Sequence, residues 1–184
     1  VYRYELSRNQ LNELINDIIT NPNGRRHIIS FWNWANINEK ALVECAYETI
    51  WTVRGKYLDM FLNQRSGDLL TASGAGGINE IQYAALLMMI AQCTGYEPGK
   101  FTHFVVNEHL YDLHIDQAKE LIHRANERHL ATFEALKNGE IDKNLMPKLV
   151  LNSEKNNFYD MTINDFSMEN YKPMKPQLTL PLGV

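Results

Sequence analysis

The feature of this sequence that most restricts its fold is the stretch Glu80–Cys93, which is almost wholly apolar. Its alanine, leucine and methionine residues favour a helix. A helix that is apolar on every side has to be covered by neighbouring elements. The stretch is too short to cross a membrane, which takes about 20 residues. We therefore expect a long, buried central helix around which the rest of the chain packs.

The other predicted elements follow no regular alternation along the chain. Leu11, Leu14, Ile15 and Ile18 recur at the spacing of an amphipathic helix, with Ser7 and Gln10 as its predicted capping box. Strands are predicted at 27–32, 47–53, 56–62, 101–106 and 148–151, with a tight hairpin turn at Arg54-Gly55. Further helices are predicted at 112–124 and 131–137, and the proline-containing tail 173–184 is expected to run extended across a surface. This order favours a single domain of the α+β class over a doubly wound sheet.

Charge and cysteine content exclude several kinds of partner. The chain carries 18 Lys and Arg against 22 Asp and Glu, a net charge of −4, which does not suit bulk electrostatic binding of nucleic acid. The sequence has no membrane-spanning apolar run and no signal-peptide pattern at its start. Its two cysteines, Cys45 and Cys93, cannot build a disulfide framework, and no metal-ligand spacing surrounds them. We expect a cytoplasmic protein without a membrane, nucleic-acid or metal partner.

Cys45 and the block Gln64–Asp68 are the first candidates for chemistry. A free cysteine is usually a buried structural residue, and Cys93, inside the apolar stretch, is interpreted that way. Cys45 is either structural or a nucleophile, and a nucleophile would need a cation nearby. Gln64-Arg65-Ser66-Gly67-Asp68 follows a predicted strand and offers a cation, a hydroxyl and a carboxylate, which suits an anionic ligand as well as a solvated turn.

Three further positions keep two interpretations open. Arg25 and Arg26 are either surface charges or residues of two different sites, because adjacent side chains diverge. Asn79, with Gln82 three residues later, is either a helix N-cap or an amide that pairs with an amide-like ligand edge. His109 and Tyr111 face the same way on an extended segment and could bind a sugar hydroxyl or be half-buried.

Taken together and in order, these blocks resemble the thymidylate synthase family, from about Leu11 to Val184. The blocks that carry the resemblance are Arg25–Ile28 before a Trp-Asn pair, Ala41–Cys45, Gln64–Asp68, Asn79, Tyr83–Leu87, Met89–Gly99, His109–Tyr111 with His114, Phe166 and Tyr171–Pro173. The resemblance implies a mixed sheet packed on helices, and a homodimer that forms through the sheet. It also implies a methyltransferase that converts dUMP to dTMP with 5,10-methylenetetrahydrofolate.

The resemblance further implies a role for each candidate residue. Cys45 would add to C6 of the pyrimidine, while Arg65 would bind the phosphate and stabilise the thiolate. Gln64 and Ser66 would bind substrate, Ser66 through the same phosphate, and Asn79 would pair with O4 and N3 of uracil. His109 and Tyr111 would bind the 3′-hydroxyl, Asp68 would orient the pterin, and the chain-end Val184 would close over the folate. Arg25 and Arg26 would reach the phosphate in the partner's site.

The sequence also departs from the family pattern. Glu44-Cys45-Ala46 replaces Pro-Cys-His, and Glu44 would disfavour the thiolate. A longer glycine-rich loop, 72–78, precedes Asn79. The family's N-terminal portion, with a catalytic glutamate and folate-stacking tryptophans, has no counterpart that we find. The departures leave two alternatives: a pyrimidine-nucleotide hydroxymethylase of the same fold, or a non-catalytic nucleotide-binding homologue.

Overall fold

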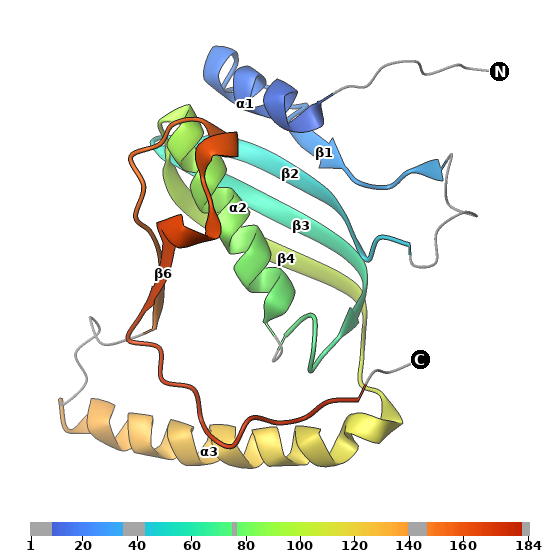
Figure 1. The fold of residues 1–184 in the computed structure, drawn as a ribbon, viewed down its shortest axis with the longest axis vertical. Coiled ribbons are helices and arrows are strands. Elements are labelled where there is room, and N and C mark those ends of the chain that lie inside the picture. The colour runs from blue at the N-terminus through green and yellow to red at the C-terminus, as the bar shows by residue number, and fades with distance from the viewer. Residues whose placement is uncertain (1–8, 35–42, 75–76, 140–146, 182–184) are drawn as a thin grey trace.

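A computed structural model describes residues 9–34, 43–74, 77–139 and 147–181 (Figure 1). A hairpin of β2 (Ala46–Arg54) and β3 (Tyr57–Asp68) forms the centre of the main sheet. Its turn is Gly55-Lys56, one residue later than predicted, because Arg54 still pairs with Tyr57. Gly55 has a φ of 62°, a conformation that glycine adopts without a steric penalty.

The main sheet is mixed, as the resemblance implied. Its strand order is β1-β2-β3-β4, with β1 (Ile28–Ser30) antiparallel to β2 and β4 (Glu97–His109) parallel to β3. Both β3 and β4 continue past their predicted ends at 62 and 106, since the two strands stay paired as far as Asp68 and His109. The polar ends of β3 and β4 therefore lie side by side.

The predicted central helix is confirmed as α2 (Ile78–Thr94), which connects β3 to β4. Leu87, Ile90 and Ala91 are its buried residues. Ile78 and Ile81 are more than half exposed, so the helix is not covered on every side, contrary to expectation. Its N-cap is Gly77, in a left-handed conformation, so the interpretation of Asn79 as the N-cap is wrong. Asn79 lies one residue inside the helix, where its side chain is available for other contacts.

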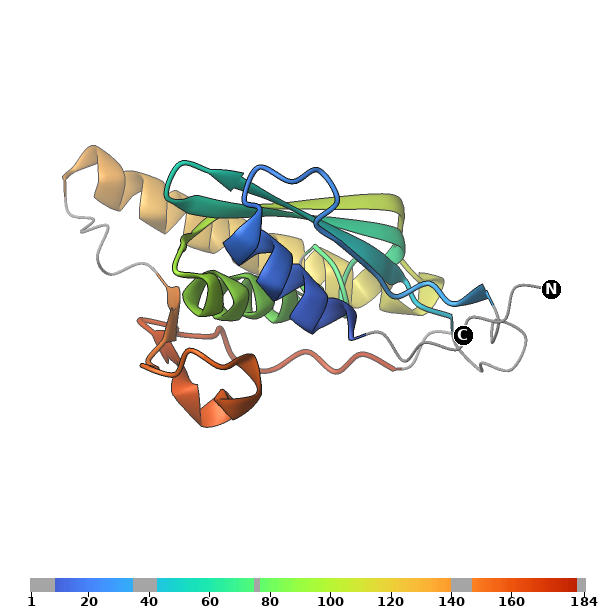
Figure 2. The same ribbon diagram turned by 90° about the horizontal axis from the view of Figure 1, so that it is seen from above.

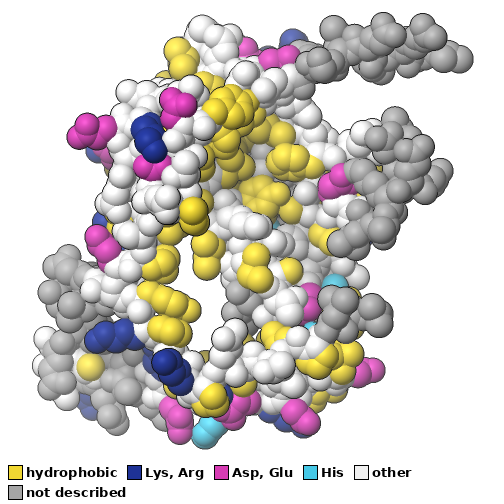
Figure 3. All heavy atoms as spheres, in the orientation of Figure 1, with side chains coloured by type: hydrophobic (Ala, Val, Ile, Leu, Met, Phe, Trp, Pro, Cys, Tyr) yellow, Lys and Arg dark blue, Asp and Glu magenta, His cyan; other side chains and the backbone are white. Residues whose placement is uncertain are grey.

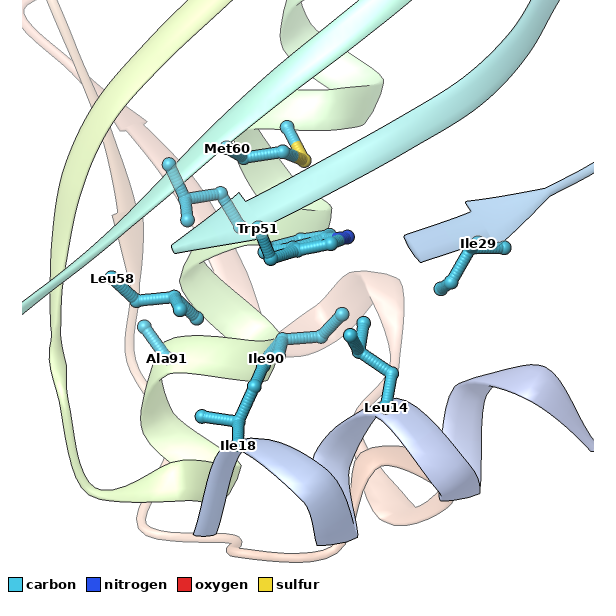
Figure 4. Packing of buried hydrophobic residues seen from close by; sticks show 9 residues of the cluster. Leu14, Ile18, Ile29, Trp51, Leu58, Met60, Ile90 and Ala91 are labelled. Carbon is cyan, nitrogen blue, oxygen red and sulfur yellow. The ribbon is translucent and has the colours of Figure 1, made fainter. Parts of the chain in front are cut away.

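The hydrophobic core lies between the sheet and the two helices α1 (Gln10–Thr20) and α2 (Figure 4). Leu14 and Ile18 of α1 point toward Ile90 of α2, and Trp51 packs against them from the sheet. The predicted capping box is wrong, because Asn9 caps α1. The Gln10 side chain instead bonds to the backbone of Ser30 in β1: its Nε2 donates to the carbonyl, and its Oε1 accepts from the N–H. Ser7 lies outside the described residues.

The region after β4 differs most from prediction. A short 3-10 turn, η2 (Asp112–His114), leads into one continuous helix, α3 (Ile115–Lys137), where two helices were expected. The sequence between the two predicted helices, 125–130, contains no glycine or proline that would end a helix. In Figure 1, α3 lies across one end of the molecule, away from α1 and α2.

The C-terminal part of the chain returns along α2 and α3. β5 (Lys148–Leu151) pairs with β6 (Phe166–Glu169), which was not predicted, and two 3-10 turns, η4 (Phe158–Asp160) and η5 (Ile163–Asp165), lie between them. Residues 171–181 form no helix or strand and cross α3, as expected for an extended tail. Arg124 and Gln117 of α3 donate hydrogen bonds to the carbonyls of Pro176 and Thr179.

Two surfaces of this fold are open. Figure 2 shows α1 and α2 on one face of the main sheet. No helix lies against the opposite face in the part of the chain that the structure describes. Figure 3 shows an opening between the α2 side of the molecule and α3, next to a groove of about 780 Å³ between α3 and the tail. Across the described residues, no helix combines the length and apolarity needed to span a membrane.

The packing predicts a large difference between two isoleucines. Ile90 is fully buried, whereas Ile163 is 83% exposed. Ile90→Ala should lower the free energy of unfolding by about 2–5 kcal/mol, because it leaves a cavity in the core. Ile163→Ala should change it by less than about 0.5 kcal/mol. Urea denaturation of both variants measures the difference, and equal losses would contradict the packing described for α2.

Candidate active site

A cavity of about 920 Å³ collects most of the predicted site residues. Its walls come from the segment before β2, the ends of β3 and β4, the start of α2 and the C-terminal tail. Eight predicted residues line it: Cys45, Gln64, Arg65, Ser66, Asp68, Asn79, His109 and Tyr111. Residues that were scattered between positions 45 and 111 therefore face one space.

Cys45 lies against the guanidinium of Arg65. The antiparallel register of β2 and β3 places the two residues side by side, and the Arg65 backbone N–H donates to the Cys45 carbonyl at 2.8 Å. Arg65 Nη2 lies 3.7 Å from Cys45 Sγ. The same side chain donates from Nε to the Glu44 carbonyl and from Nη2 to the Val43 carbonyl, at 3.0 and 2.9 Å. Three contacts fix the guanidinium beside the sulfur, which is the cation that a nucleophilic cysteine requires.

The second cysteine has a different environment. Cys93 lies in α2, and burial raises the pKa of its thiol. A raised pKa keeps the thiol protonated and unreactive at neutral pH. The interpretation of Cys93 as structural fits this position.

Gln64 and Asn79 form an amide pair in the wall of the cavity. Gln64 is fully buried, and its Nε2 donates to the Ser66 carbonyl at 2.8 Å. Its Oε1 accepts from Asn79 Nδ2 at 2.8 Å. One Asn79 N–H is thus used inside the protein, while Asn79 Oδ1 and the second N–H remain for a ligand in the cavity.

The carboxylate of Asp68 closes the turn that follows β3. It accepts from the Leu70 backbone N–H at 3.2 Å and from the Thr71 hydroxyl. Directly before Asp68, Gly67 allows the loop to approach β3 closely, because a Cβ at Gly67 would collide with the Ser73 hydroxyl. This explains the glycine inside the Gln64–Asp68 block.

His109 and Tyr111 lie beside this turn, since Asp68 pairs with His109 where β3 and β4 end. Their rings meet edge to face with centroids 5.1 Å apart. Next to them, His114 is fully buried and its Nε2 donates to the Pro181 carbonyl at 2.7 Å. This bond holds the tail at the cavity, which Leu180 and Pro181 line. Val184 lies outside the described residues.

Arg25 and Arg26 do not join the cavity. They line a separate groove of about 370 Å³ with Asp17, Asn21 and His27, and this groove shares no lining residue with the Cys45 cavity. Within one chain, the arginine pair and the cysteine therefore belong to different sites.

Sequence reasoning missed several residues around the cavity. Thr71, Gln82 and Tyr83 line it. His103 contacts the lining residue Gln64, and Glu80 contacts His103. Burial raises the pKa of the Tyr83 hydroxyl. His103 carried no signal beyond its place on a strand, since its partners come from β3 and α2. Among the described residues, no group of three or more His, Cys, Asp or Glu side chains could hold a metal ion.

Comparisons with known proteins agree on one family. The family model described as thymidylate synthase matches residues 3–184. Thymidylate synthases of Streptococcus pneumoniae strain 70585 and Streptococcus pyogenes serotype M3 are each 39% identical over 180 residues, covering 95% of this chain and 58% of the relative. The solved structure of thermostable thymidylate synthase A from Bacillus subtilis matches with a TM-score of 0.74 and 34% identity, over 92% of this chain and 54% of that chain. This chain thus spans a little over half the length of these relatives.

The environments of the two cysteines predict different reactivity. Iodoacetamide at neutral pH should alkylate Cys45 before Cys93, because only the Cys45 sulfur contacts a guanidinium, whereas burial raises the pKa of the Cys93 thiol. Arg65→Gln should slow alkylation of Cys45 by roughly tenfold, the effect of losing a charge-assisted hydrogen bond, and should leave Cys93 unchanged. Peptide mass spectrometry reads both sites in one sample.

In urea the two cysteines should react at similar rates, which controls for intrinsic differences. Equal rates in the folded protein would contradict the electrostatic role of Arg65.

Proposed function

This chain belongs to the thymidylate synthase family, and we propose that it forms the nucleotide-binding and nucleophile-bearing part of an enzyme that converts dUMP to dTMP. The observation that carries the proposal is the contact between Cys45 Sγ and the Arg65 guanidinium, at 3.7 Å, in the wall of a large cavity. A cysteine held against a cation and open to a ligand space has the arrangement of a nucleophile.

Cys45 would begin the reaction by adding to the uracil ring. The thiolate forms a C–S bond at C6, and the electron pair of the C5–C6 double bond moves onto C5 and O4. C5 then becomes the nucleophile that takes up the one-carbon unit. Loss of the C5 proton lets the bond between the one-carbon unit and the folate nitrogen break, which leaves an exocyclic methylene on C5. Hydride from the folate adds to this methylene as the C5–C6 double bond re-forms and the C–S bond breaks, so that Cys45 is unchanged at the end.

Asn79 would recognise the base during these steps. Its Oδ1 accepts from N3–H of uracil, and its second N–H donates to O4. Negative charge develops on O4 when the thiolate adds, so a donor at that atom stabilises the transition state more than the ground state. The bond from Asn79 Nδ2 to the buried Gln64 supports this role by fixing the amide before substrate arrives.

The remaining polar residues suit the sugar and the phosphate. Arg65 and Ser66 would bind the phosphate, and His109 and Tyr111 would bind the 3′-hydroxyl. Arg25 and Arg26 would bind the phosphate in the site of a second copy. Their distance from the cavity of their own chain agrees with such a role, since a separate groove holds them.

The folate would bind beside the nucleotide. 5,10-Methylenetetrahydrofolate supplies the one-carbon unit and the hydride that reduces it. The cavity volume of about 920 Å³ lies at the upper end of the usual range for small-molecule sites, about 300–1,000 Å³, which suits the proposal of a second ligand. Asp68 would accept from pterin N–H groups, while Leu180 and Pro181 offer apolar surface, with Val184 closing over the ligand.

A homodimer would form through the open face of the main sheet. Ile28, Ile50 and Phe61 lie on one rung of this face, each at least 37% exposed. Phe104 and Val106 continue it on β4 and are 62% and 66% exposed. A contiguous apolar face of this kind is typical of a protein interface. The free thiol of Cys45 would also need a reducing compartment, which favours the cytoplasm.

A covalent trap tests the proposed chemistry. The 5-fluoro analogue of dUMP should form a stable adduct on Cys45 in the presence of methylenetetrahydrofolate, since fluorine at C5 cannot leave as a proton does. Mass spectrometry of the natural protein that carries this chain would locate the added mass on the Cys45 peptide. Cys45→Ser should form no adduct.

Absence of the adduct in the unmodified protein would contradict the proposed function. With dUMP as substrate, the expected product carries a 5-methyl group. A 5-hydroxymethyl product would instead identify the hydroxymethylase alternative.

The proposed interface predicts the effect of charge on the open sheet face. Phe104→Lys combined with Val106→Lys should convert a dimer into a monomer, because two like charges would face their counterparts across the two-fold axis. Sedimentation velocity measures the oligomeric state. The control Ile163→Lys adds a charge at a site that is 83% exposed and away from the main sheet, and it should remain dimeric. A dimer that survives the double substitution would contradict this interface.

A further inference from the structure

Outside the cavity lining, hydrogen bonds connect Glu80 in α2 to His103 in β4, and His103 to the buried amide of Gln64. We propose that Glu80 and His103 are positioning residues that lock the Gln64 amide and, through it, make Asn79 select uracil over cytosine. This proposal rests on the proposed function, in which Asn79 reads the pyrimidine.

His103 links the two ends of this line. Its Nε2 lies 3.0 Å from Gln64 Oε1, and its Nδ1 lies 2.9 Å from Glu80 Oε1. The His103 side chain is only 10% exposed, and the ring of Phe101 stacks on it at an interplanar angle of 13°. The imidazole is therefore held in one plane, with each nitrogen aimed at one oxygen.

The hydrogen-bond partners determine which atoms donate. Gln64 Nε2 faces the Ser66 carbonyl, which can only accept, so the Gln64 atom that faces His103 and Asn79 is the oxygen. The Glu80 carboxylate also accepts. The lock needs a hydrogen on His103 Nε2, because that nitrogen faces the Gln64 oxygen, while Nδ1 lies against the Glu80 carboxyl group.

Glu80 is itself fixed at two points. It lies in the first turn of α2, where a carboxylate interacts favourably with the helix dipole. The same oxygen that meets His103 accepts from the Gly74 backbone N–H at 3.0 Å. Glu80 thereby connects the loop after β3, the helix α2 and the strand β4.

The consequence for Asn79 follows from the two lone pairs of Gln64 Oε1. One accepts from His103 and the other from Asn79 Nδ2. Turning the Asn79 amide over would bring two oxygens face to face at 2.8 Å, which is repulsive. The orientation that remains offers an acceptor to N3–H and a donor to O4, the pattern of uracil. Cytosine has the reverse pattern, with an acceptor at N3 and a donor at N4.

Without the His103 donor, only the Ser66 carbonyl would hold the Gln64 amide in this orientation. Gln64 would then turn its amide over more readily and present Nε2 to Asn79, and Asn79 would turn in response. The cavity would then display the edge that complements cytosine. Two side chains that line no part of the cavity would in this way determine which base it accepts.

Two nearly isosteric substitutions separate positioning from packing. His103→Gln keeps a donor near the place of the imidazole Nε2, facing Gln64. His103→Asn keeps one near Nδ1, facing Glu80, and loses the bond to Gln64. Calorimetry on the natural protein would give the Kd for dUMP and for dCMP. His103→Asn should reduce the preference for dUMP by about tenfold or more, and His103→Gln by less than about threefold.

Glu97→Gln serves as the matched control, because it removes an exposed carboxylate from the first residue of the same strand and should leave the preference unchanged. The preference is a ratio measured on one preparation, so loss of folded protein affects both ligands equally. An unchanged preference in His103→Asn would overturn the proposal. An equal loss in both His103 variants would also overturn it, because the ring would then only fill space.

A separate measurement keeps this test distinct from the proposed function. An unmodified protein that binds neither nucleotide would contradict the proposed function. The ¹⁵N resonances of His103 in the ligand-free protein would still report the lock, with a hydrogen expected on Nε2. A ring without a hydrogen on Nε2 would overturn the proposal.

Discussion

β3 pairs along its length with β2 on one side and with β4 on the other, and the polar walls of the cavity depend on these two registers. The antiparallel register with β2 brings the residue before that strand, Cys45, beside Arg65. The parallel register with β4 pairs Asp68 with His109 and Leu62 with His103. A slip of one residue in either pairing would turn every side chain of the partner strand to the opposite face. The strand registers of the sheet therefore determine which side chains face the cavity.

The same strand divides the molecule into a stabilising part and a functional part. Near the hairpin turn, β3 packs Leu58 and Met60 into the core with the helices, and Leu62 is also fully buried. Further along, the inward position is taken by Gln64, whose burial without partners would cost about 1–3 kcal/mol. Ser66, Asn79 and His103 meet both ends of its amide. The helix α2 repeats this division, with Ile90 in the core and Asn79 at the cavity.

The sequence predicts best where periodicity and local chemistry agree. The hairpin strands and the helix at Leu11–Ile18 were confirmed because each buries one side against the core. The helix α2 was confirmed because its alanine, leucine and methionine residues favour a helix. The N-cap of α2 was misassigned because a left-handed Gly77 takes the position that Asn79 and Gln82 suggested. The Cys45–Arg65 contact came from the family resemblance, since 20 residues separate the two and only strand register joins them. His103 and Glu80 were not predicted as site residues for the same reason.

Arg65 also shows why a single chain with a net charge of −4 would need further cations to bind a phosphate. A guanidinium has five N–H donors. Here Nε and Nη2 are directed at the segment Val43–Cys45. Within the described residues, no hydrogen bond involves Nη1, which leaves that nitrogen and Ser66 as the donors for a dianion. The other acceptor sites of the phosphate would then remain for cations from outside the chain. Arg25 and Arg26 precede β1 in the sheet whose open face we propose as the interface, so a second copy bound there is the natural source. In this arrangement the arginine that prepares the nucleophile is also the one that makes the dimer necessary.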